Sequence, residues 1–109
     1  MNVKRGDLVT IAVSGDYGKP RPALIIQSDA FDALGSVTVA PLTSEIYQAP
    51  LFRVTIHPGK ETGLQRISQV MVDKITTVPR VKIGQRIGSV DTSTLRTVNQ
   101  ALKGFLDLE

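Results

Sequence analysis

The sequence predicts a small antiparallel sheet, twisted or barrel-like and covered by helix, in an all-β or α+β fold. Short apolar or alternating segments recur along most of the chain and are separated by Gly, Pro, Ser and Asp, which is typical of successive strands. Only the last segment has the apolar spacing of an amphipathic helix. A chain of 109 residues fits one domain spanning 1–109 and leaves no room for a second core.

Two strands are expected on either side of a polar loop near the start of the chain. Residues 8–13 alternate, with Val9, Ile11 and Val13 on one face, which predicts a strand. Residues 23–26 are a continuous apolar run, which is consistent with a strand buried on both faces. The loop between these strands contains two glycines, so its backbone can move more freely than that of its neighbours.

A short helix and a third strand are expected next. Residues 28–35 indicate one or two helical turns, with Ser28 as the N-cap and Gly35 as the stop. Residues 37–42 predict a strand. Pro41 has no N–H to donate to a neighbouring strand, which indicates an edge strand or a bulge.

Two further β segments follow. Residues 51–56 alternate cleanly, and this places Arg53 on the polar face of a half-buried strand. Residues 68–78 are a longer β-prone run whose alternation slips at Asp73 and Lys74, so a bend or bulge is expected there.

The chain is expected to end in one more strand and a helix. Residues 85–90 predict the strand, and Asp91 or Thr92 can cap the helix. The apolar positions of this helix recur at helical spacing and are Leu95, Val98, Ala101, Leu102, Phe105 and Leu106.

Composition excludes several classes of site and location. The chain has no cysteine and one histidine, so it has no disulfide and we expect neither a metal site nor a cofactor. It has no apolar run of membrane-spanning length and no secretory signal at its start, so we expect a cytoplasmic protein without membrane contact. The net charge of +3 permits an anionic partner, although solvated surface charge is the simpler explanation. A core of this size would gain from burial against a second copy, which favours a homodimer.

Arg21 is the most unusual polar residue of the chain because it stands between Pro20 and Pro22. A residue that precedes proline is held in extended geometry, so less entropy is lost when its position is fixed. A guanidinium held in this way suits bidentate binding of a phosphate. Taken alone, an ordinary solvent-facing arginine at the start of a strand is the simpler interpretation.

Other candidate residues carry comparable alternatives. Tyr17 can stack on a base or belong to a plain hairpin loop. Thr43 and Ser44 follow the third strand, where a hydroxyl can donate to a phosphate oxygen or form a local turn bond. His57 falls on the polar side at the end of a strand and is interpreted as a bystander. The common phosphate-binding glycine motifs and the G-x-S-x-G nucleophile motif are absent.

Taken together, the chain resembles the MazF/PemK family of toxin endoribonucleases along nearly its whole length. The ordered set of motifs is more specific than any one of them. The motifs are RGD at 5–7, GKPRPALIIQSD at 18–29, PLTS at 41–44, GL at 63–64, SQV at 68–70 and KITTV at 74–78.

The resemblance implies a mainly β fold with helices, namely a small SH3-like barrel of the MazF/CcdB type with a C-terminal helix, usually as a homodimer. It implies the toxin of a type II toxin–antitoxin system, which a cognate antitoxin neutralises by blocking the RNA groove. The implied activity is sequence-specific, metal-independent cleavage of single-stranded RNA. In that reaction the 2′-hydroxyl attacks the adjacent phosphorus and leaves a 2′,3′-cyclic phosphate and a 5′-hydroxyl.

The resemblance assigns catalysis to Arg21 and Thr43, which match the family's catalytic arginine and threonine. The further residues expected to contact RNA are Ser14, Asp16, Tyr17, Lys19, Ser44, Gln69, Lys74, Thr76 and Arg80. The chain departs from the family at Thr76, where members often carry an arginine. An ordinary arginine is too basic to accept a proton at neutral pH, so Arg21 is expected to act electrostatically, with Asp16 and His57 as alternative proton acceptors.

Two other functions compete with this interpretation. The first is a non-enzymatic, CcdB-like toxin that poisons gyrase, an activity associated with a tryptophan near the C-terminus; this chain has none. The second is an SH3-like module that only binds RNA or protein, which the ordered pair of Arg21 and Thr43 disfavours.

Overall fold

The computed structural model describes residues 3–12 and 19–109. Within these residues the strands are β1 (Asp7–Ala12), β2 (Pro20–Ile25), β3 (Ser36–Thr43), β4 (Arg53–Ile56), β5 (Ser68–Met71), β6 (Thr76–Pro79) and β7 (Ile83–Ser89). Single-turn 3-10 helices η1 (Asp29–Phe31), η2 (Val72–Lys74) and η3 (Arg80–Lys82) lie between strands, and helix α1 (Thr92–Phe105) follows β7.

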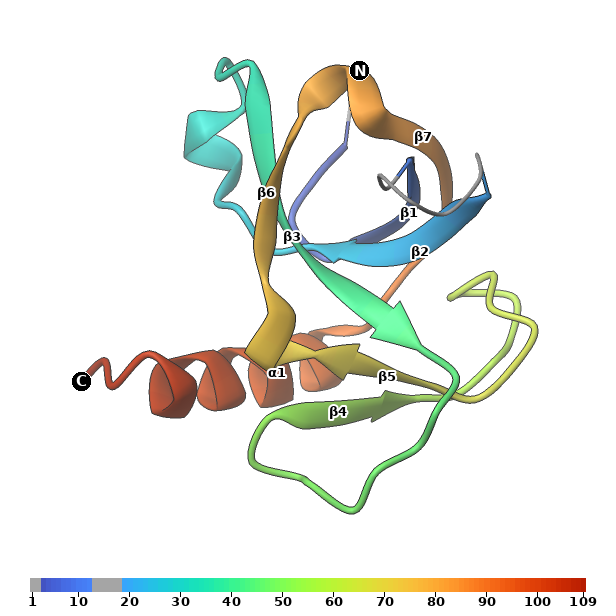
Figure 1. Cartoon of the computed structure of the whole chain (residues 1–109), viewed down its shortest axis with the longest axis vertical. Coiled ribbons are helices and arrows are strands. Elements are labelled where there is room, and N and C mark those ends of the chain that lie inside the picture. Colours follow the sequence, from blue (N-terminus) through green and yellow to red (C-terminus); the bar gives the residue numbers. More distant parts are fainter. Residues whose placement is uncertain (1–2, 13–18) are drawn as a thin grey trace.

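The strands form one antiparallel sheet whose longest member, β3, is its centre. The neighbours run in the order β4-β5-β3-β2-β1-β7, and β6 pairs with β3 beside β5. The first half of β3 pairs with β6 and its end pairs with β5. Figure 1 shows the strands curling around each other while α1 covers the side near β4 and β5. The predicted barrel-like sheet with a C-terminal helix is confirmed, although the pairing path of the described strands is open rather than closed.

Two apolar clusters lie on opposite faces of the central strands. Leu8 and Leu24 belong to the cluster beneath α1, where Val98 contributes from the helix. Val9 and Ile25 belong to the cluster inside the curl of the sheet. β1 is therefore buried on both faces, and the predicted first strand is confirmed over residues 8–12. The prediction for residues 23–26 is confirmed at Leu24 and Ile25.

The helix caps and the bend lie close to where the sequence predicted them. Ser28 caps η1 by accepting the N–H of Ala30 at 3.2 Å, but η1 is a single exposed turn. The expected bend at residues 73–74 is η2, which separates β5 from β6. Asp91 rather than Thr92 caps α1, and it accepts the N–H of Thr94 at 2.8 Å. Among the described residues, no helix is long and apolar enough to cross a membrane.

Pro41 lies on the central strand, so of the two predicted alternatives, an edge strand or a bulge, the edge strand is wrong. On one side of β3, Pro41 pairs with Ala23 of β2. The N–H of Ile26 donates to the carbonyl of Thr38, so the even-numbered residues of β3 turn their backbone groups toward β2. The nitrogen of Pro41 therefore faces the other side, between the β6 ladder and the β5 ladder. A missing N–H leaves no partner unsatisfied there.

Candidate functional site

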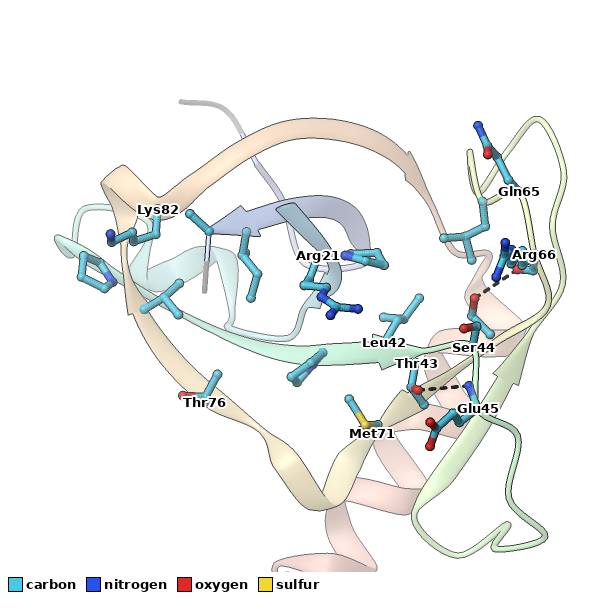
Figure 2. Close-up of a pocket in the computed structure, with 18 residues that line it drawn as sticks. Arg21, Leu42, Thr43, Ser44, Glu45, Gln65, Arg66, Met71, Thr76 and Lys82 are labelled. Carbon is cyan, nitrogen blue, oxygen red and sulfur yellow. Dashed lines mark hydrogen bonds between the residues drawn. The ribbon is translucent and has the colours of Figure 1, made fainter. Parts of the chain in front are cut away.

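A cavity of about 750 Å³ opens where β2 begins and β3 ends. Its walls come from β1, β2, β3, β5, β6 and the segment before β5, so residues far apart in the sequence meet in it. Figure 2 shows the labelled side chains around this space. Arg21 and Thr43 both line it, as do Ser44 and Thr76.

The register of the sheet brings Arg21 and Thr43 together. Ala23 of β2 is paired with Pro41 of β3. Arg21 lies two residues before Ala23 and Thr43 lies two residues after Pro41, so in an antiparallel pair they fall opposite each other on one face. In Figure 2 the guanidinium of Arg21 reaches over β3 toward the end where Thr43 lies.

The two prolines of β2 explain why the ladder stops beside this cavity. Even-numbered residues of this segment turn their backbone groups toward β3, as the hydrogen bond from Ile26 to Thr38 shows. Pro20 and Pro22 therefore face β3 without an N–H to donate. The ladder between β2 and β3 ends at Ala23, and the arginine between the prolines is left at the mouth of the cavity.

Thr43 is held by a local turn bond without losing its donor. Its Oγ1 accepts the N–H of Glu45 at 3.1 Å. A hydroxyl has one proton and two acceptor lone pairs, so this bond fixes the oxygen and leaves the O–H able to donate. The local bond considered from the sequence and the proposed contact to a phosphate oxygen are thus compatible.

Arg66 and Lys82 also line the cavity, and sequence reasoning missed both as site residues. Lys82 belongs to a cluster of basic residues at 80–86, and this cluster is the sequence feature that could have identified it. Arg66 follows the turn-rich residues 57–63, and nothing local indicated that this segment reaches the cavity. With Arg21, these side chains give the described lining of the cavity three cations and a single carboxylate, Glu45. The electrostatic balance favours an anion.

Several of the predicted RNA contacts lie away from the cavity. Lys74 is exposed on η2. Arg80 donates from Nε to the carbonyl of Leu34 at 3.0 Å, on another part of the surface. Lys19 is exposed just before β2 and His57 is exposed just after β4, and neither lines the cavity. The remaining predicted contacts, Ser14, Asp16 and Tyr17, lie outside the described residues.

Gln69 is buried, and its side chain is engaged within the protein. Its Oε1 accepts the N–H of Tyr47 and its Nε2 donates to the carbonyl of Tyr47, both at 3.0 Å. A third contact runs from Nε2 to the hydroxyl of Thr55 at 3.3 Å. Gln69 therefore ties the loop after β3 to the sheet, and the structure does not place it in the cavity.

Arg53 lies beside this anchored loop. The prediction that it lies on a polar face of its strand is wrong, because the residue is buried. Only 7% of Arg53 is exposed, and its guanidinium binds both oxygens of Asp73 at 2.9 and 3.2 Å. Its Cζ also lies 4.7 Å from the centre of the Tyr47 ring and 5.8 Å from that of Phe52. The hydrogen bond from Arg53 holds the pKa of Asp73 below its usual value. Alternation alone cannot reveal a charge buried by a partner twenty residues away.

The described residues contain no group of three or more His, Cys, Asp or Glu side chains placed to hold a metal ion. The polar side chains that line the cavity are mainly guanidinium, ammonium and hydroxyl donors, together with the carboxylate of Glu45 and the amide of Gln65. Such a set can bind a phosphate and stabilise charge that develops on it.

Comparisons with known proteins cover nearly the whole chain. A family model described as PemK-like, MazF-like toxin of type II toxin–antitoxin system matches residues 4–106. A protein from Mycolicibacterium smegmatis, called probable endoribonuclease MazF, is 47% identical over 107 residues, which cover 97% of this chain and 98% of that protein.

Solved structures agree with the fold. The Mycobacterium tuberculosis toxin MazF-mt6 superposes with a TM-score of 0.82 at 26% identity, covering 94% of this chain and 98% of that one. A second structure, an endoribonuclease in complex with its cognate antitoxin from a mycobacterial species, has a TM-score of 0.83 at 24% identity and covers 99% and 98% of the two chains.

Proposed function

This chain belongs to the family of PemK-like, MazF-like toxins of type II toxin–antitoxin systems, and we propose that it cleaves single-stranded RNA at Arg21 and Thr43. The protein is an endoribonuclease and acts as the toxin of its system. The observation that carries the assignment of residues is the meeting of Arg21 and Thr43 at the mouth of a cation-lined cavity. Neither the gyrase-poison alternative nor the binding module accounts for a close relative named as an endoribonuclease.

The reaction uses the nucleophile that RNA itself carries. The 2′-hydroxyl loses its proton and its oxygen bonds to the adjacent phosphorus, while the bond from phosphorus to the 5′-oxygen breaks and that oxygen gains a proton. The products are a 2′,3′-cyclic phosphate and a 5′-hydroxyl. No metal is required if the protein aligns the 2′-oxygen with the phosphorus and stabilises the extra negative charge of the transition state.

Arg21 and Thr43 supply that stabilisation in the proposed mechanism. The guanidinium of Arg21 pairs with the scissile phosphate and strengthens this pairing as negative charge develops. The hydroxyl of Thr43, oriented by the N–H of Glu45, donates to a non-bridging oxygen or helps to orient the 2′-hydroxyl. Arg66 and Lys82 are placed to bind neighbouring phosphates, with Ser44 and Thr76 as further donors.

The partners follow from the same cavity. We propose that a cognate antitoxin neutralises the protein by covering the cavity and excluding RNA. We further propose a homodimer in the cytoplasm, with residues 1–109 forming a single domain. Phe105 and Leu106 at the end of α1 remain exposed, which would favour burial against a second copy.

One assay tests the assignment. A long single-stranded RNA incubated with the protein in EDTA should be cut at discrete sites, and Arg21→Ala should lower the cleavage rate by at least about a hundredfold. Arg80→Ala is the matched control, because it removes an arginine that lies outside the cavity. Uncut RNA across many sequences would reject the endoribonuclease function, and equal losses in both variants would reject the role of Arg21.

A second substrate tests the chemistry. Replacing the nucleotide 5′ of the scissile phosphate by its deoxy form removes the 2′-hydroxyl and should abolish cleavage at that bond. Mapping the ends of the products detects this directly. Continued cutting at the substituted site would reject internal transesterification.

A further inference from the structure

Glu45 is the side chain of the cavity that phosphate binding does not explain. It is the single carboxylate lining the cavity among the described residues, where Arg21, Arg66 and Lys82 provide positive charge. A carboxylate repels the RNA backbone, so its presence there weakens binding of phosphate. In nucleic-acid interfaces, phosphate contacts mainly position the ligand and base contacts specify it. A carboxylate in such a cavity is therefore better suited to a base than to the backbone.

The backbone of Glu45 is held next to Thr43. Its N–H donates to the hydroxyl oxygen of Thr43 at 3.1 Å, so Glu45 and Thr43 occupy one turn. Figure 2 shows Thr43, Ser44 and Glu45 in succession at the end of β3. If Thr43 contacts the scissile phosphate, Glu45 can reach only the nucleotides that flank it. This argument rests on the function proposed above.

The loop that carries Glu45 is held to the sheet through Tyr47, which contacts Gln69 and Arg53. The Tyr47 hydroxyl donates to Oε2 of Glu45 at 3.4 Å, a long bond that orients one carboxylate oxygen and leaves the other able to accept. The backbone of Tyr47 is held on both sides by the Gln69 amide, at 3.0 Å each. The ring of Tyr47 packs against the buried guanidinium of Arg53. A side chain positioned in this way is partly preorganised for recognition.

The chemistry of an ionised carboxylate limits what it can select. It only accepts hydrogen bonds, so it favours a base edge that carries donors. Adenine, cytosine and guanine each present an exocyclic amino group, and these edges are accessible in single-stranded RNA. Uracil has no amino group, and its carbonyl oxygens on either side of N3–H would repel a carboxylate. Guanine has the best match, because its N1–H and its amino group are adjacent donors.

We propose that Glu45 is a specificity-determining residue that selects an amino-bearing base over uracil at one nucleotide beside the scissile phosphate. Glu45 takes no part in the bond-breaking step. Gln69, Tyr47 and Arg53 act as positioning residues that hold its loop in place.

The test measures kcat/KM on a set of short RNAs that differ only in the nucleotides flanking one cleavage site. The wild-type protein should prefer an amino-bearing base over uracil by about ten- to a hundredfold at one of these positions. Glu45→Gln and Glu45→Ala should lose this preference at that position and keep the preferences elsewhere. Glu61→Gln, which neutralises an exposed carboxylate outside the cavity, is the matched control and should behave as wild type.

Two further measurements make the outcome specific. Replacing the preferred base by an analogue that lacks only its amino group should slow the wild-type protein but not Glu45→Ala. Tyr47→Phe, which removes the hydroxyl that contacts Glu45, should weaken the same preference partially. An unchanged preference in Glu45→Gln, or a loss spread evenly over all positions, would overturn the proposal. RNA left uncut by the wild-type protein would instead reject the proposed function itself.

Discussion

At the scale of single residues, the hydroxyl of Thr43 accepts one hydrogen bond from Glu45 and is proposed to donate another to the substrate. Substitutions can remove this hydroxyl without changing the branched shape of the side chain. Thr43→Val keeps the branched form but removes the hydroxyl that accepts from Glu45 and would donate to the substrate. We expect the single-turnover cleavage rate to fall about a hundredfold, because one donor to the developing charge is lost. Thr43→Ser retains the hydroxyl and should cleave much faster than Thr43→Val. A valine variant that cuts at the wild-type rate would remove Thr43 from the mechanism.

The pair of Arg53 and Asp73 predicts a pH dependence of stability. The pKa of Asp73 is lowered in the folded state by its hydrogen bond to Arg53, so its contribution is fully present above the ordinary pKa of an aspartate in the unfolded chain. That contribution is lost as the pH falls through the lower folded-state pKa. Asp73→Asn should therefore be less stable at pH 7, by about 3 kcal/mol, because a buried guanidinium loses its charged partner.

Urea unfolding measured between neutral pH and about pH 2 checks this prediction. The difference in the free energy of unfolding between the wild type and Asp73→Asn should shrink as the solution becomes acidic. Parallel profiles over the whole range would show that Asp73 does not titrate in the way its contact with Arg53 requires.

At the scale of elements, the sequence predicted where helices and strands begin and end better than it predicted which elements contact each other. The two caps, Ser28 and Asp91, bond to N–H groups two or three residues away, and the bend at residues 73–74 is also local. The sequence therefore identifies all three. The burial of Arg53 depends on Asp73, and the place of Arg66 at the cavity depends on how its segment packs against β7. These are contacts over long sequence separations, and no local pattern encodes them.

β7 provides an element-scale prediction through its contact with the loop before β5. A Cβ added at Gly88 would overlap the backbone of Glu61 and Thr62, while the N–H of Ser89 donates to the carbonyl of Glu61 at 2.8 Å. Gly88→Ala should therefore lower the free energy of unfolding by about 1–3 kcal/mol, because the backbone must shift. Gly59→Ala is the control, since a Cβ there meets nothing within 4 Å. Equal urea midpoints for the two variants would contradict this close packing.

At the scale of the whole molecule, the pairing path of the described strands stays open, with β4 at one end and β7 at the other. The sequence predicted a barrel-like form because its strands are short and successive, but closure depends on whether β6 and β7 pair. η3 joins them directly, and the described pairing path ends at β7 beside β1. Arg21 and Thr43 could be named as a pair from the family resemblance, whereas the sequence did not reveal the full charge lining of the cavity.

That lining makes RNA binding a property of several chain segments acting together. Arg21, Arg66 and Lys82 come from β2, from the loop before β5 and from η3, and each phosphate that they neutralise releases counterions. For single strands the slope of log K against log salt changes by about 0.7 for each phosphate contact. We therefore expect Arg66→Ala and Lys82→Ala each to reduce the steepness of this slope by about 0.7 and to weaken binding at low salt.

Fluorescence anisotropy with an RNA made uncleavable by one deoxynucleotide measures this slope without interference from cleavage. Lys103→Ala is the control, because this lysine lies on α1 outside the cavity and its loss should leave the slope unchanged. If all three variants shift the slope equally, RNA binds the overall positive charge of the protein rather than the cavity. If only Arg66→Ala and Lys82→Ala reduce it, the strand must pass through the cavity between the loop before β5 and η3, and the scissile phosphate is then carried past Arg21.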